Sequence, residues 1–168
     1  MKKLLLCLTM FCLIFTMSGC KPDLSELNSN ERLAVEAIRE FNAKGGNYDG
    51  KKLIVGCNDE NLFTESTFSF VYMRDYDYVY YDNEFYSVDE CDEVCNDINY
   101  EFKKIDMDDY DDHNEYFDDY NAIKNQIPDY KWDIYTIYSK YVCGYELGND
   151  VFNSAVTLVE YENIKQYI

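Results

Sequence analysis

Apolar residues recur at helical spacing in three stretches of the chain, and each stretch opens on a residue that suits a helix start. The first follows the polar residues 28–30 and stops at a pair of glycines. The second opens on Ser87, with Glu90 at capping-box spacing, while the third opens on Asp112 and stops at Pro128. We expect three amphipathic helices, whose apolar positions are Leu33, Ala34, Ala37, Ile38 and Phe41; Cys91, Val94, Cys95, Ile98 and Phe102; and Tyr116, Phe117, Tyr120, Ile123 and Ile127.

Short runs of β-branched and aromatic residues lie between the first two predicted helices. Residues 51–57 carry Leu, Ile and Val in succession and predict a buried strand. Residues 68–73, 76–81 and 84–87 are separated only by polar doublets, so they predict three strands joined by reversals. This order indicates an antiparallel meander.

The C-terminal part predicts further strands. Residues 131–143 are rich in Ile, Val, Tyr and Trp, which is typical of a long strand or a bent pair of strands. A turn at 148–150 leads to a strand at 151–161, for which a helix is the alternative. The expected fold class is therefore α+β: an antiparallel sheet with about three helices packed on one face, completed by a terminal hairpin.

The charge balance limits what the chain can bind or catalyse. Its 168 residues include 33 Asp and Glu against 15 Lys and Arg, a formal net charge of −18, so we expect no nucleic-acid partner. Hydrophobic residues make up 47%, enough to form a core. With one His, no Gly-rich phosphate loop and no nucleophile motif, the sequence names no catalytic residue, no cofactor and no metal ligand.

The N-terminus has the layout of an export signal. Two lysines precede an uncharged apolar run that is too short for a comfortable membrane span. The run closes with Met17-Ser18-Gly19-Cys20, and this ending resembles the lipobox of bacterial lipoproteins. The resemblance implies cleavage before Cys20 and attachment of diacylglycerol to its thiol, with fatty acids such as palmitate. An ordinary signal peptide that leaves Cys20 as a plain thiol is the alternative.

This resemblance sets the expected domain organisation and location. Residues 1–19 form the signal peptide, residues 20–29 a lipidated tether, and residues 30–168 a single acidic α+β domain. Two acyl chains anchor stably, so we expect the protein at the extracytoplasmic face of the cell membrane, in contact with the membrane through its lipid. Loss of the two leader lysines takes the side-chain charge from −18 to −20.

Four cysteines remain after the expected cleavage: Cys57, Cys91, Cys95 and Cys143. An exported domain favours disulfide bonds. Cys91 and Cys95 share the apolar face of a predicted helix, so we favour a bond from each to one of the other two, which close predicted strands. A local Cys91–Cys95 bond and four reduced buried thiols are the alternatives. The spacing lacks the CxxC pairs of zinc and redox sites.

Tyrosine is the unusual residue, with 18 copies. In the strand predicted at 76–81, alternation places Tyr76, Tyr78 and Tyr80 on one face, where they are candidate contacts for a sugar or a protein partner. Packing in an aromatic core is the alternative.

Eight acidic side chains crowd into residues 106–119. Their oxygens suggest calcium, but no register of this segment fits an EF-hand loop. A solvated connector and helix start is the plainer interpretation.

These observations favour a membrane-anchored lipoprotein whose acidic domain is a non-catalytic binding module for a protein or a glycan. Two alternatives stay open. One is a hydrolase of envelope polysaccharide that uses paired carboxylates, and the other is a surface protein that binds divalent cations weakly.

Overall fold

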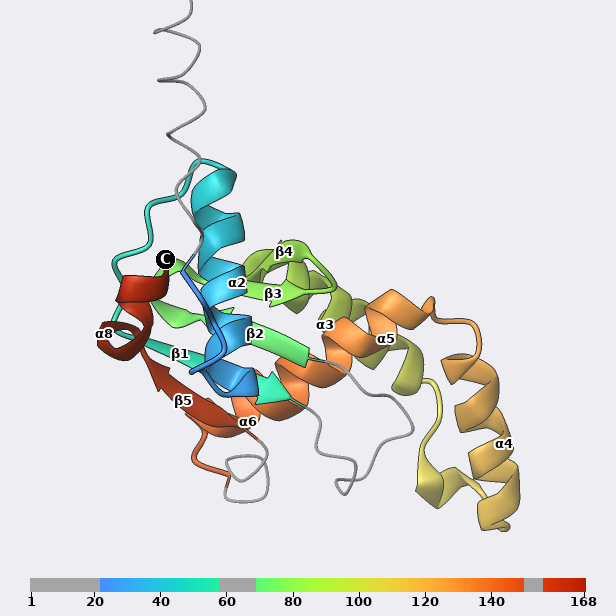
Figure 1. The fold of residues 1–168 in the computed structure, drawn as a ribbon. Coiled ribbons are helices and arrows are strands. Elements are labelled where there is room, and N and C mark those ends of the chain that lie inside the picture. The colour runs from blue at the N-terminus through green and yellow to red at the C-terminus, as the bar shows by residue number, and fades with distance from the viewer. Residues whose placement is uncertain (1–21, 58–68, 150–155) are drawn as a thin grey trace, which may run out of the picture.

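The computed structural model describes residues 22–57, 69–149 and 156–168 (Figure 1). The predicted signal peptide with Cys20, the first residue of the strand predicted at 68–73 and the first part of the strand predicted at 151–161 lie outside the described residues.

One antiparallel sheet of five strands lies at the centre of the described residues. Its strands are β1 (Lys52–Cys57), β2 (Ser69–Met73), β3 (Tyr78–Tyr81), β4 (Glu84–Ser87) and β5 (Thr157–Glu160). They pair in the order β4-β3-β2-β1-β5. Asp82 and Asn83 join β3 to β4 at positive φ angles of 48° and 63°, the geometry that two-residue hairpins favour. The predicted meander is confirmed.

The three predicted helices are present and start where their caps indicate. They are α2 (Ser29–Ala43), α3 (Val88–Phe102) and α4 (His113–Lys124). Asn28 with Glu31, and Ser87 with Glu90, form capping boxes in which each side chain bonds the other residue's backbone. Asp112 caps α4 by accepting a hydrogen bond from the Asn114 N–H. These local signals positioned the helices correctly.

The strand expected over residues 131–143 is wrong, because this segment is helical. It belongs to α5 (Asp129–Thr136), a π-helical turn (Ile137–Val142) and α6 (Cys143–Glu146), which follow one another without a break. Ile134, Ile137 and Val142 are buried at helical intervals. Their strand-like composition reflects packing: these side chains fill the layer between the helix and the sheet.

The expected terminal hairpin is also corrected. β5 pairs with β1, with Val159 opposite Leu53, so the C-terminal strand joins the sheet beside its first strand. The short helix α8 (Tyr161–Ile164) follows and buries Ile164. The Arg39 guanidinium of α2 donates a hydrogen bond to the Tyr167 carbonyl, which ties the C-terminus to α2.

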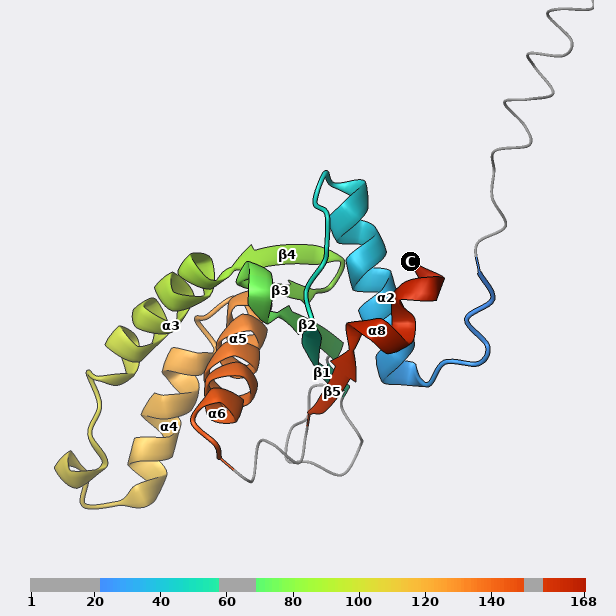
Figure 2. The same cartoon turned by 90° about the vertical axis from the view of Figure 1, so that its left-hand side faces the viewer.

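Helices cover both faces of the sheet (Figure 2). Along β1, Leu53 and Val55 face α2, whereas Ile54 faces the layer that contains Ile134 of α5. Strands that are apolar at successive positions therefore suit a sheet buried on both sides. The α+β class with an antiparallel sheet is confirmed, and α2 with α8 supply a second covered face.

The first testable prediction concerns the layer under α2. Ile38 is 0% exposed there. Its truncation to Ala should lower the free energy of unfolding by about 2–4 kcal/mol, because buried methyl groups are lost and a cavity remains. Urea denaturation followed by circular dichroism measures the change. Met107→Ala, at an exposed site, is the control and should change the free energy by less than about 0.5 kcal/mol. If the two substitutions lowered the free energy of unfolding by the same amount, Ile38 would not be packed in a core under α2.

Candidate functional site

The three tyrosines predicted as ligand contacts lie under α2. Tyr78 and Tyr80 are in β3, while Tyr76 lies in the 3-10 turn before it. Phe41 of α2 is close to two of them, with its ring centroid 5.1 Å from that of Tyr76 and 6.1 Å from that of Tyr78. Tyr80 is buried, and the Tyr76 hydroxyl is hydrogen-bonded to the Asp49 carboxylate. The structure therefore places these rings in an aromatic layer and presents no exposed row of three.

An open depression of about 300 Å³ lies beside the turn between β3 and β4. Its lining includes Glu36, Tyr80, Tyr81, Asp82 and Asn83. Two carboxylates beside tyrosines are the groups that the hydrolase alternative requires. Both Glu36 and Asp82 are exposed to water, in a depression that is itself open to solvent.

The acidic residues predicted at 106–119 lie on a projection that we call the acidic arm, residues 106–124. It consists of a 3-10 turn (Met107–Asp109) followed by α4, and it projects beside α3 and α5, away from the sheet (Figure 2). Eight Asp and Glu residues against one Lys give the acidic arm a formal charge of −7 with its His neutral. No residue of α4 is buried, so this helix adds nothing to either core layer.

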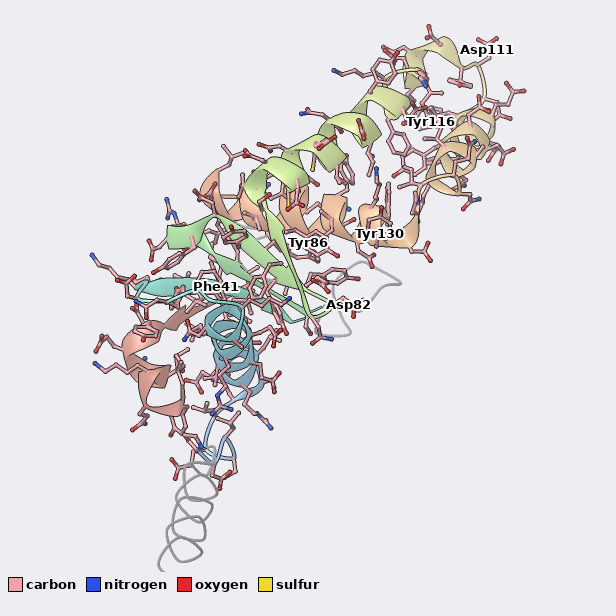
Figure 3. All side chains as sticks on the ribbon, turned by 90° about the horizontal axis from the view of Figure 1, so that it is seen from above. Phe41, Asp82, Tyr86, Asp111, Tyr116 and Tyr130 are labelled. Carbon is pink, nitrogen blue, oxygen red and sulfur yellow. The ribbon has the colours of Figure 1, made fainter. Side chains whose placement is uncertain are left out.

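A seam of aromatic rings attaches the acidic arm to the domain. Tyr120 of α4 lies 4.7 Å from Phe102 of α3, and Phe102 lies 6.1 Å from Trp132 of α5, measured between ring centroids. Tyr116 extends this seam between α3 and α4 (Figure 3). The Lys124 ammonium lies 5.1 Å from the Trp132 ring, a cation–π contact. Rings rather than buried aliphatic side chains hold the arm in place.

Other aromatic rings of this region face water. Phe117 on α4 is 52% exposed, and Tyr130 at the start of α5 is 54% exposed. Aromatic residues are enriched at protein-binding surfaces, where polar residues form the rim. The Tyr110 hydroxyl donates a 2.7 Å hydrogen bond to Asp119, and this bond raises the pKa of Tyr110 to about 12. The arm thus combines aromatic contact area with a strongly negative surface.

The acidic arm does not present a formed cation site. Across residues 22–57, 69–149 and 156–168, no group of three His, Cys, Asp or Glu side chains is arranged to hold a metal ion. Asp106 and Asp112 instead accept hydrogen bonds from backbone N–H groups two residues ahead. The cation-binding alternative gains no support from this geometry.

Three of the candidate disulfide cysteines come together between α3 and α6. Cys91 is buried in the layer with Ile137, while Cys95 and Cys143 are partly exposed. All three are free thiols in this structure. Cys143 opens α6, so the expectation that it closes a strand is corrected. Cys57 is the last residue of β1, as expected.

Burial makes these thiols hard to ionise. It raises the pKa of Cys91 to about 12 and that of Cys95 to about 11, and nearby thiols and carboxylates add to both shifts. Burial also raises the pKa of Cys143. The cluster is therefore protonated at neutral pH, unlike a catalytic thiol.

Comparison of the chain with known protein families, with curated proteins and with solved structures finds no match. In the part of the chain that the structure describes, no helix has the length and apolar character needed for a membrane span.

Sequence reasoning missed the seam of rings because it placed Trp132 in a strand. One available signal was Pro128, which precedes Asp129 and stands at the start of α5. Proline suits a helix start as well as a helix end, because its nitrogen has no hydrogen to leave unsatisfied. The same residue was interpreted only as the end of the preceding helix.

The second prediction follows from the raised pKa values. In the folded protein kept reduced at pH 8, iodoacetamide should alkylate Cys95 at least about 100-fold more slowly than in the urea-unfolded chain, because so little thiolate is present. The rate should rise about tenfold per pH unit up to about pH 10. Mass spectrometry of quenched time points measures it. Similar rates in the folded and unfolded chains would show that Cys95 is not shielded.

Proposed function

We propose that this chain is a bacterial lipoprotein, acylated at Cys20 and held at the extracytoplasmic face of the cell membrane, whose acidic domain binds a partner. The lipobox-like ending of the apolar leader supports the anchor. Leu24 and Leu27 lie within residues 20–29, which were expected to form a tether, but they already pack against the layer under α2, so the connection between Cys20 and the folded domain is shorter than expected. Such a short connection holds the domain close to the membrane surface.

The acidic arm is the proposed binding surface. Its helix α4 buries no residue of its own, yet the arm as a whole carries eight acids, and α4 exposes Phe117. This one observation carries the proposal, because a helix that adds nothing to the core needs another role. The described chain begins at one end of the molecule and α4 lies at the other (Figures 1 and 2). A domain tethered by its N-terminus would present this arm away from the lipid.

Charge complementarity indicates the class of partner. A −7 surface attracts a protein surface rich in Lys and Arg, and it speeds association with such a surface at low salt. Exposed aromatic rings add apolar contact area, whose contribution to binding does not depend on the charge of the partner. We therefore take the partner to be a basic protein of the cell envelope or surface; a neutral glycan would gain nothing from the acids.

The third prediction tests the anchor. Cells expressing the full chain are grown with a radiolabelled fatty acid. The wild-type protein and a Cys12→Ala variant should both incorporate the label, whereas Cys20→Ala should incorporate none, because its thiol is the expected acceptor. Autoradiography of the purified protein measures incorporation. Equal labelling of Cys20→Ala would refute acylation at that residue.

The fourth prediction tests the acidic arm. A synthetic peptide of alternating Lys and Phe serves as the basic probe, and calorimetry measures its binding to the full chain. Changing Asp111 and Asp118 to Asn should weaken binding about fivefold, because two exposed charges are lost from the contact surface.

The matched control removes two charges elsewhere. Glu36 and Glu93 are exposed and lie outside the acidic arm, so their joint change to Gln should leave the affinity within about twofold of wild type. Equal losses in the two variants would mean that the probe senses only total charge, and the arm would not be the binding surface.

A further inference from the structure

The depression beside the turn between β3 and β4 lies between elements that are distant in the sequence. Leu33 and Glu36 of α2 line it from one side, while the ends of β2 and β3 and their hairpin turn line it from the other. Figure 3 shows Asp82 at the tip of this hairpin. The volume of about 300 Å³ is at the small end of the range for ligand sites, so it suits a small molecule or a single side chain.

Each side of the depression supplies a carboxylate. Glu36 comes from α2 and Asp82 from the turn, and both side chains are exposed. Within residues 22–57, 69–149 and 156–168, neither carboxylate forms a salt bridge with a basic side chain. Because a hollow lined by one sign of charge concentrates the field, these two groups attract a cation.

Further acids surround Tyr80, which lines the same depression. Burial raises the pKa of its hydroxyl, and the carboxylates of Glu40, Glu36 and Glu84 add to this rise because they repel the tyrosinate charge. The Lys44 ammonium offsets part of the negative charge, since it lies 3.7 Å from Glu40 and 3.5 Å from Glu84. With the acid of the turn included, four carboxylates and one ammonium leave a formal charge of −3 around the depression.

The hydroxyl hydrogens of both lining tyrosines are already used. Tyr80 donates a 3.2 Å hydrogen bond to the side-chain oxygen of Asn83, and Tyr81 donates one to the Asp133 carboxylate of α5. These bonds fix the two tyrosine side chains, whose hydroxyls can then only accept from a ligand. A ligand that complements this lining therefore carries a positive charge and several hydrogen-bond donors.

We propose that the depression binds a guanidinium group, carried by a small molecule or by an arginine side chain. Guanidinium has five N–H donors, no acceptor and a permanent charge. Its planar fork pairs with a carboxylate through two parallel hydrogen bonds, and its flat face stacks on aromatic rings, which this lining also supplies. An ammonium group is a point charge without this fork. The proposal depends neither on the lipid anchor nor on the acidic arm, whose residues do not line the depression.

The probe is agmatine, a guanidinium joined by a short chain to an amine, and its matched control is putrescine, in which a second ammonium replaces the guanidinium. Calorimetry measures the binding of each to the full chain at about 0.15 M salt, which screens attraction over longer distances. Agmatine should bind at least about tenfold more tightly than putrescine, because only guanidinium pairs with a carboxylate through two hydrogen bonds. Equal affinities, or no binding of agmatine at millimolar concentration, would overturn the proposal.

Two conservative substitutions locate the binding. Glu36→Gln and Asp82→Asn should each weaken agmatine binding at least about fivefold, because each removes a charged acceptor. Both suit the fold, since Glu36 is exposed and asparagine favours the φ angle of 48° at residue 82. Glu93→Gln, at an exposed position of α3 outside the depression, is the control and should leave the affinity within about twofold of wild type. If all three variants lost the same affinity, agmatine would sense only the total charge and the assignment would be wrong.

A capped tripeptide, acetyl-Gly-Arg-Gly-amide, distinguishes the two sources of the guanidinium. If it binds as tightly as agmatine, the depression accepts an arginine side chain of a protein; if agmatine alone binds, the depression accepts a small molecule. The peptide of Lys and Phe that tests the acidic arm contains no guanidinium. A failure of that test therefore leaves this proposal standing, and the reverse also holds.

Discussion

The structure depends on burying one five-stranded sheet on both faces. Alternate residues of β1 and β2 belong to two separate apolar layers. Leu53 and Val71 lie under α2, whereas Ile54 and Phe70 face α5. Because the central strands β1 and β2 bury side chains on both faces, helices are needed on both sides of the sheet, and the chain supplies them from its two ends and its middle. Gly56 shows how tightly these layers are filled, since the Phe70 ring occupies the space that its side chain would need.

This constraint distinguishes the acidic arm from the rest of the chain. α2, α3 and α5 each bury residues against the sheet, but α4 buries none and is held by aromatic contacts such as that between Tyr120 and Phe102. Its acids repel one another, which is unfavourable for a segment whose only role is to fold. A projecting segment with the exposed Phe117 ring and a strong negative charge is instead suited to contact with another molecule.

Local signals in the sequence predicted the fold well where they were specific. The capping pairs at Asn28 and Ser87 placed two helices, and the Asp82-Asn83 doublet placed a hairpin turn. Composition failed at residues 131–143, where Ile, Val and Tyr favoured a strand although Ile134 and Ile137 have helical spacing. For the site, the shared face of Cys91 and Cys95 was foreseen, but their neighbour Cys143 depends on tertiary packing. The projection of the acidic arm likewise depends on how α3 and α5 meet, which no short window of sequence encodes.

Hydrogen–deuterium exchange tests most directly the central claim that the core is complete without α4. Amides of β1 and β2 should exchange only on global unfolding, because both faces of the sheet are buried, while amides of α4 should exchange orders of magnitude faster through local opening. If α4 is protected as strongly as β1, it belongs to the same cooperative unit as the core. The interpretation of the acidic arm as a separate binding element would then be contradicted.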